Sequence, residues 1–308
     1  LGGGGGRAGH PGGAVGGSAG PAPPSAPAGA GQAEPADAPG ARPPDRWPAD
    51  LPLTARACDQ QAALAGSACV APGQVKATYG TGVFVLAHAG ETVPEPGEGL
   101  LPTVAWRAGG RDTYALDGGV FAAGAMLDWL CDALGVAPTP AQLGELARTV
   151  PDARGARVLP ALAGLGAPWW DPGARAVLAG IDGGTTRAHL ARAALEGIAW
   201  RVADIVAEIR RELPVDALRV DGGLTNEPLL LELQASAIGV PVEAAGADAT
   251  VTGVAGLAAA GARLLGSIAE IAAPVPAERR VAPTGDGDAR EDAHERWRTF
   301  VRAAGGLR

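Results

Sequence analysis

The chain is poor in the residues that build disulfide frameworks and metal centres. Its 308 residues include three cysteines, four histidines and one methionine. No two cysteines form a CxxC pair, and the histidines are isolated, so neither residue type has the spacing of a metal site. An odd number of cysteines is typical of a reducing compartment, and we expect a cytoplasmic protein.

Further absences limit the partners. No apolar run reaches the length of a membrane span, and the first residues lack the charged start and apolar core of a signal peptide. Acidic residues outnumber basic ones by 33 to 25, which gives a formal net charge of −8 at pH 7. The arginines are scattered and form no basic stripe. We therefore expect neither a membrane nor a nucleic acid as partner.

The composition divides the chain into three parts. Residues 1–46 are almost entirely Gly, Ala and Pro, have no triplet period, and hold too little apolar surface to offset the entropy of ordering. They predict a disordered tail, with a functional linker as the alternative. Residues 47–275 have alternating apolar runs and turn residues, which predicts one folded domain. Residues 276–308 predict a C-terminal extension with one helix.

The order of elements predicts the fold class. Residues 74–88 read as a β-hairpin with Gly-Thr-Gly at its tip, and a second strand pair turns at Gly109–Gly110. A long amphipathic helix follows, with Thr186 as its N-cap. Beyond it, strands alternate with helices. Hairpins followed by alternating strands and helices indicate an α/β domain with a mixed sheet.

Two glycine turns are candidate phosphate sites. Gly80 and Thr81 lie at the hairpin tip, where backbone N–H groups and a hydroxyl can cradle phosphate oxygens. The alternative is a tight turn without a ligand. Gly222 and Gly223 follow a strand and precede a helix, which is the geometry of a nucleotide at a helix N-terminus. The alternative there is a plain strand–helix connection.

Two single residues have open interpretations. Gly124, inside a predicted helix, indicates either a close approach of another backbone or a mild packing defect. Asp59 is a candidate catalytic base, because phosphoryl transfer to an alcohol needs a carboxylate that takes the proton of an aligned hydroxyl. Its alternative is the N-cap of the helix that follows.

Several motifs occur together in one order. These are "DQQAALAG", "KATYGTGVFVL", "YALDGGVFAAGAMLDWL", "GLGAPWWDPGARAVLAGI", "HLARAALEGIAWRVADI", "LRVDGGLTNEPLLLELQASAIGVPV" and "ATVTGVAGLAAAG". In this order and spacing, residues 51–304 resemble the C-terminal half of the FGGY carbohydrate kinases, and among them most closely the glycerol kinases. The "GLGAPWWDPGAR" loop favours that subgroup over the pentulose kinases.

The resemblance implies a ribonuclease-H-like, actin-type ATPase domain that uses ATP with Mg²⁺ and phosphorylates a polyol or sugar. By motif, Asp59 is implied as the base and Gln60 as its neighbour at the polyol. Gly80 and Thr81 are implied as the phosphate loop. The positions implied to contact the nucleotide are Gly124, Asp128, Gly222, Gly223, Asn226 and Glu227. No metal ligand is implied.

The chain also departs from the family pattern. Cys58 precedes the acid where glycine is usual, Asp128 stands where glutamine is common, and Glu227 stands where asparagine is frequent, which bears on nucleotide affinity. The tail replaces the family's N-terminal domain, and the chain starts with Leu1, which indicates a truncated or mis-assembled reading frame.

Two hypotheses follow. One is a polyol kinase represented by its nucleotide-binding half and inactive alone, because acceptor-binding residues are missing. The other is a non-catalytic nucleotide-binding or interaction module. Its face toward the missing domain should be apolar, which favours a homo-oligomer or a separate N-terminal half as partner.

Overall fold

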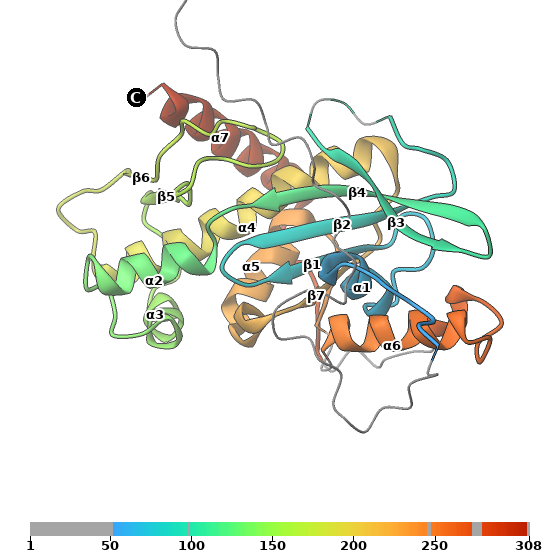
Figure 1. Cartoon of the computed structure of the whole chain (residues 1–308). Helices are drawn as coiled ribbons and strands as arrows, with labels where there is room; N and C mark the ends of the chain where they lie inside the picture. Colours follow the sequence, from blue (N-terminus) through green and yellow to red (C-terminus); the bar gives the residue numbers. More distant parts are fainter. Residues whose placement is uncertain (1–51, 96, 98, 245–247, 273–278, 307–308) are drawn as a thin grey trace, which may run out of the picture. The chain divides into compact units, whose positions relative to one another are not determined.

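The computed structural model describes residues 52–95, 97, 99–244, 248–272 and 279–306 (Figure 1). The tail predicted at residues 1–46 lies outside the described residues. From Leu53 onward the chain belongs to one compact unit. No helix in the described part is both long and apolar enough to cross a membrane.

A seven-stranded mixed sheet forms the centre of this unit, with the strand order β3-β4-β2-β1-β7-β8-β9. The β1–β7 and β7–β8 pairs are parallel and the other pairs antiparallel. These strands are β1 (Val75–Tyr79), β2 (Val83–Gly90), β3 (Leu101–Ala108), β4 (Arg111–Val120), β7 (Leu218–Asp221), β8 (Val242–Ala244) and β9 (Arg279–Val281). Strands β5 (Arg157–Leu159) and β6 (Val177–Ala179) form a separate pair. The predicted mixed α/β class is confirmed.

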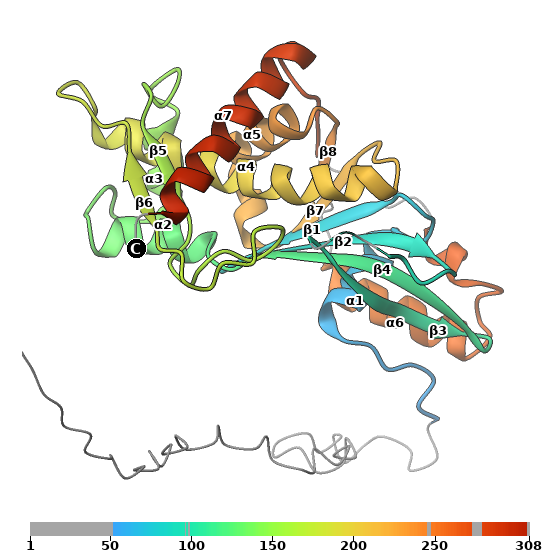
Figure 2. The same ribbon diagram turned by 90° about the horizontal axis from the view of Figure 1, so that it is seen from above.

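The described helices include the predicted long one, which has a capping box between Thr186 and His189. Their bounds are α1 (Asp59–Gly66), α2 (Gly124–Asp132), α3 (Pro140–Ala147), α4 (Arg187–Glu212), α5 (Pro228–Ile238), α6 (Ala249–Gly261) and α7 (Gly287–Gly305), with the 3-10 helices η2 (Gly223–Asn226) and η3 (Ile268–Ala272). Helices α4 and α5 cover one face of the sheet, and α1 and α6 cover the other (Figures 1 and 2).

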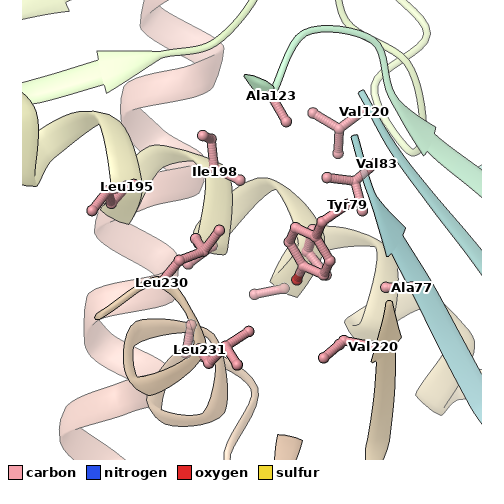
Figure 3. Close-up of a cluster of buried hydrophobic side chains, with 14 of the residues drawn as sticks. Ala77, Tyr79, Val83, Val120, Ala123, Leu195, Ile198, Val220, Leu230 and Leu231 are labelled. Carbon is pink, nitrogen blue, oxygen red and sulfur yellow. The ribbon is translucent and has the colours of Figure 1, made fainter. Parts of the chain in front are cut away.

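The alternation along β1 assigns its side chains to the two faces. Because successive side chains of a strand point to opposite faces, Ala77 and Tyr79 point toward α4 and α5, while Lys76 and Thr78 point toward α1. Figure 3 shows Tyr79 in the apolar core between the sheet and these helices, near Ile198. The Tyr79 hydroxyl donates a 2.7 Å hydrogen bond to Gln234 Oε1, so the buried phenol is satisfied.

A buried carboxylate joins α4 to the C-terminal helix. Asp204 has no exposed surface, and it accepts hydrogen bonds from Trp169 Nε1 (2.9 Å) and Trp297 Nε1 (3.1 Å). It also pairs with Arg201 at 2.9 Å and with His294 at 2.8 Å. Since these partners come from α4, the Trp169 loop and α7, one side chain holds three segments together (Figure 2 shows α7 crossing α4).

Helices α1 and α6 approach each other unusually closely. A Cβ added at Gly253 would lie 1.7 Å from the carbonyl oxygen of Ala62, and one at Gly66 would lie 1.8 Å from that of Ala249. Contacts of this length do not occur between real atoms. Helix α6, which consists largely of small residues, therefore uses its glycines to pack directly against the helix that begins with Asp59.

Gly253→Ala is expected to destabilise the chain by about 1–3 kcal/mol, the usual range for an overpacked contact. The methyl group would force α1 and α6 apart, and this outweighs the gain of about 1 kcal/mol that alanine brings to a helix. Denaturant unfolding measures the effect. Gly287→Ala is the control, because only Arg290 lies near that helical glycine, at 4.0 Å; equal stability of the two variants would contradict the close packing.

Candidate active site

The first part of the site is the turn that starts α1. Asp59 is exposed and lies in the first turn of the helix, while Cys58 occupies the N-cap position. The alternative that Asp59 is the N-cap is therefore wrong. Both carboxylate oxygens accept hydrogen bonds from Gln60, from its backbone N–H at 2.8 Å and from its side-chain amide at 3.3 Å. The adjacent glutamine thus orients the acid.

The second part is the β1–β2 tip, where Gly80 and Thr81 are exposed. The start of α2 packs onto this tip: Ala123 N–H donates to Thr81 O at 2.8 Å, and Gly124 N–H donates to Gly80 O at 3.1 Å. A Cβ at Gly124 would lie 2.6 Å from Gly80 O, so of the two interpretations of Gly124, the close backbone approach is the one observed.

One detail of the tip limits what it offers to a phosphate. The Gly80 N–H donates to Gly82 O at 2.8 Å, so it is already used within the turn. The Thr81 side chain stands exposed at the tip. A phosphate approaching here would meet the threonine, while Gly80 contributes open space rather than a free N–H.

The third part is the turn between β7 and η2, which lies directly beside the first tip. Thr78 and Asp221 are register partners on neighbouring strands. Gly222 has φ +94°, and a Cβ there would lie 2.3 Å from Tyr79 O. Gly223 is exposed, with open space where a Cβ would be. The two glycine turns, separated by about 140 positions in the sequence, therefore meet at the same end of the sheet.

The remaining predicted nucleotide contacts differ in their surroundings. Asn226 is exposed at the end of η2, and Asp128 is exposed on α2 one turn beyond Gly124. Glu227 instead caps α5 by accepting from Leu229 N–H at 2.9 Å, and it forms an ion pair with Arg148. Its carboxylate thus has a structural role in this chain, which the sequence did not indicate.

Lys76 connects these parts and was missed by the sequence analysis. It is fully buried on the α1 face of β1, and its ammonium donates to Gln60 Oε1 and, at 2.9 Å, to Thr78 Oγ1. Burial lowers its pKa from 10.5 to about 8, against the opposing effect of nearby carboxylates, Asp221 first. The signal was present as the single charged residue of the predicted strand.

The carboxylates around Lys76 are also perturbed. Burial raises the pKa of Asp221 and of Asp117, and the charge of Lys76 works against both shifts. The neighbouring Thr78 hydroxyl also opposes the rise in the pKa of Asp221, which burial nevertheless keeps above its ordinary value. The Oδ1 atom of Asp221 is buried and has no protein partner within the described residues. Perturbed ionisable groups of this kind are enriched at functional sites.

An exposed aromatic ring lies beside the polar groups. Phe84 is 46% exposed and is the register partner of Thr78 on β2, so it lies on the same face of the sheet. Sequence reasoning placed this residue in the strand and missed its exposure, because an apolar side chain in a strand is expected to be covered.

The described residues do not form a metal-binding cage. Among them there is no group of three or more His, Cys, Asp or Glu side chains that could hold an ion. Mg²⁺ commonly binds through one or two carboxylates and the phosphates of its substrate, so the bare chain does not have to supply such a cage. The site offers Asp59 and Asp221 as carboxylates. A cavity of about 470 Å³ between α4, α5 and α7 contains none of the predicted site residues.

Comparison with known proteins identifies the class to which this fold and site belong. Residues 75–262 match the C-terminal domain of the FGGY family of carbohydrate kinases. The chain therefore belongs to the FGGY family of carbohydrate kinases.

Its relatives include glycerol kinases. It is 44% identical over 265 residues to a glycerol kinase of Alkalilimnicola ehrlichii, covering 84% of this chain and 52% of that kinase. It is 41% identical over 260 residues to glycerol kinase 2 of Thermotoga maritima, covering 83% and 52%. The structure of Plasmodium falciparum glycerol kinase with ADP superposes with a TM-score of 0.74 at 29% identity, over 80% of this chain and 50% of that one. The chain spans about half the length of these relatives.

Proposed function

We propose that the chain is the nucleotide-binding half of an ATP-dependent polyol kinase of the glycerol kinase type. The observation that carries the proposal is the meeting of two exposed glycine turns at one end of the sheet, joined to an exposed acid through Gln60, Lys76 and Thr78. Phosphoryl transfer needs positioned phosphates and a base for the acceptor hydroxyl, and this arrangement can supply both.

Each group has a defined task in this proposal. Asp59 accepts the proton of the attacking hydroxyl as the γ-phosphoryl group is transferred to that oxygen, and Gln60 holds the carboxylate in place and borders the polyol. Thr81 donates to the phosphates, and Gly223 leaves room for the nucleotide to approach the second turn. The exposed ring of Phe84 offers an apolar wall to the carbon chain of the acceptor.

Nucleotide contacts with Gly80, Gly124, Asp128, Gly222 and Asn226 belong to the same proposal, as does a cytoplasmic location, which the three free cysteines support. Mg²⁺ would enter with the phosphates and neutralise their charge. The carboxylates of Asp59 and Asp221 would hold it together with the phosphates. The division into domain 47–275 and extension 276–308 is likewise a proposal.

Isothermal titration with ADP tests the proposal. The chain is expected to bind ADP, and Thr81→Ala is expected to weaken the affinity about tenfold, which corresponds to one charge-assisted hydrogen bond of about 1.5 kcal/mol. Thr103→Ala, on the edge strand β3, serves as the control and should leave the affinity unchanged. Absence of ADP binding at millimolar concentration would contradict a nucleotide site.

A coupled assay with glycerol and Mg-ATP tests the activity of the isolated chain. We expect no appreciable turnover, because aligning the acceptor contributes much of the rate and the chain spans half the length of its relatives. Turnover that Asp59→Asn abolishes would overturn this expectation and support Asp59 as the base.

The second candidate is a non-catalytic nucleotide-binding or interaction module. It is favoured by one observation, the use of the Glu227 carboxylate as a helix cap and ion-pair partner. ADP binding without turnover, even after mixing with a separate N-terminal half of a glycerol kinase, would support this candidate.

A further inference from the structure

Lys76 is an exceptional residue in this chain. The sequence holds 25 lysines and arginines, and Lys76 is the only lysine among them. It is also fully buried, in the central strand β1. A buried charge is costly unless hydrogen bonds and opposite charges compensate it. The surroundings of Lys76 therefore indicate what the residue does.

The ammonium group bonds to two different parts of the site. On one side it donates to Gln60 Oε1, and the Gln60 amide in turn donates to Asp59 at 3.3 Å. On the other side it donates to Thr78 Oγ1 at 2.9 Å, and Thr78 is the register partner of Asp221, the residue before the second glycine turn. A path of hydrogen bonds thus links the acid of α1 to Thr78, which lies beside Asp221 at the end of β7.

We propose that Lys76 is a positioning residue, whose buried ammonium holds the Asp59–Gln60 turn and the Gly222 turn at a fixed separation. The proposal rests on the proposed function, since it assigns these two turns to acceptor and nucleotide. Lys76 itself touches neither. A compact ammonium with three donors suits this place better than the planar guanidinium that every other basic residue of the chain carries.

A neighbouring arginine shows what a purely structural cation looks like here. Arg219 on β7 is the register partner of Lys76 and points to the same face of the sheet. It donates to Ala68 O at 2.6 Å and pairs with Glu243 at 3.6 Å. The bond to Ala68 holds the end of α1 that is remote from Asp59, and the pair with Glu243 links β7 to β8. The two cations therefore secure opposite ends of one helix.

The charge state of Lys76 should be visible at both turns. Its pKa, lowered by burial to about 8, lies within an accessible pH range. Other titratable or charged groups face it from α1, β4 and β7. They are Asp59 on α1, Cys69 after α1, Asp117 on β4, and Asp221 and Arg219 on β7, with Asp248 at the start of α6 acting on Asp221.

Nuclear magnetic resonance of the full chain tests the proposal directly. Because the chain has one lysine, labelling with ¹³Cε-lysine yields a single side-chain signal, which is expected to titrate with a midpoint near 8. The backbone amides of Gln60 and Gly222 should shift with the same midpoint. The proposal would be overturned if the lysine signal titrates while the amide signals of Gln60 and Gly222 do not change with pH.

Three variants separate positioning from general stability. In Lys76→Met the amide signals of Gln60 and Gly222 should no longer shift with a midpoint near pH 8. In Arg219→Met both signals should still show this shift. Thr78→Val cuts one arm only, so Gln60 should keep the shift while Gly222 loses it. If Lys76→Met does not fold, Thr78→Val still decides, because an unchanged shift at Gly222 would refute the path.

Titration with ADP links the path to the proposed function. Lys76→Met is expected to weaken ADP binding at least tenfold and Arg219→Met to leave it unchanged; equal affinities of Lys76→Met and the wild type would refute the role of Lys76 at the nucleotide side. Failure of the wild type to bind ADP would instead refute the nucleotide site. The amide titrations still report whether Lys76 couples the two turns.

Discussion

Replacing Asp204 by asparagine is expected to lower the free energy of unfolding by about 3–5 kcal/mol, the cost of breaking a buried ion pair. The neutral amide would leave Arg201 buried without its counter-charge. Its oxygen can still accept from Trp169 and Trp297 at the Oδ2 position, but its NH₂ group would then replace the oxygen that faces His294. Denaturant unfolding measures the change. Asp112→Asn is the control, because it breaks the exposed pair with Arg107, and exposed pairs contribute little.

The same variant should change the acid stability. Burial alone would raise the pKa of Asp204, but the hydrogen bond from His294 and the charge of Arg201 hold it below its ordinary value of 3.8. A lowered pKa in the folded state means that the stabilisation is fully present above pH 3.8 and is lost as the pH falls through the folded pKa. The Asp204→Asn variant should lack this part of the acid transition; an unchanged acid profile would contradict the assignment.

Gly222→Ala and Gly223→Ala are expected to differ strongly although the residues are adjacent. At Gly222 a methyl group would lie 2.3 Å from Tyr79 O, on a backbone with φ +94°. The clash and the strain together should cost about 2–5 kcal/mol of stability. At Gly223 no atom lies within 4 Å of an added Cβ, so the alanine variant should unfold like the wild type.

The pair also separates stability from ligand binding. If the space beside Gly223 receives a nucleotide, Gly223→Ala should lower the ADP affinity while the melting temperature stays the same. Parallel thermal unfolding and ADP titration of both variants check this. Equal stability of the two would contradict the close approach of the glycine turns, and unchanged ADP affinity in Gly223→Ala would place the nucleotide elsewhere.

The α1–α6 face gives this site its support. Asp59 begins α1, and α1 is locked to α6 at Gly66 and Gly253, where a methyl group would not fit. The other end of α1 is tied to β7 through Arg219. The acid that we propose as the base is therefore carried on an element packed firmly at both ends, as a positioned catalytic group would need.

Much of the fold could be predicted because it depends on local patterns. Alternating apolar residues and a Gly-Thr-Gly tip specify the β1–β2 hairpin, and an apolar stripe with a capping threonine specifies α4. The motif order was sufficient for the family as well. These features are properties of short segments, so they can be predicted from the local sequence.

The partners of individual side chains were decided by the tertiary structure. Nothing in the neighbouring sequence marks the roles of Lys76, Asp204 and Glu227. Each side chain takes its role from partners that lie far away in the sequence. Whether a charge on a strand is solvated or buried depends on the helix that covers that face. Polar contacts between distant segments form only when packing has removed the competing water. The local sequence does not determine which distant segments pack together.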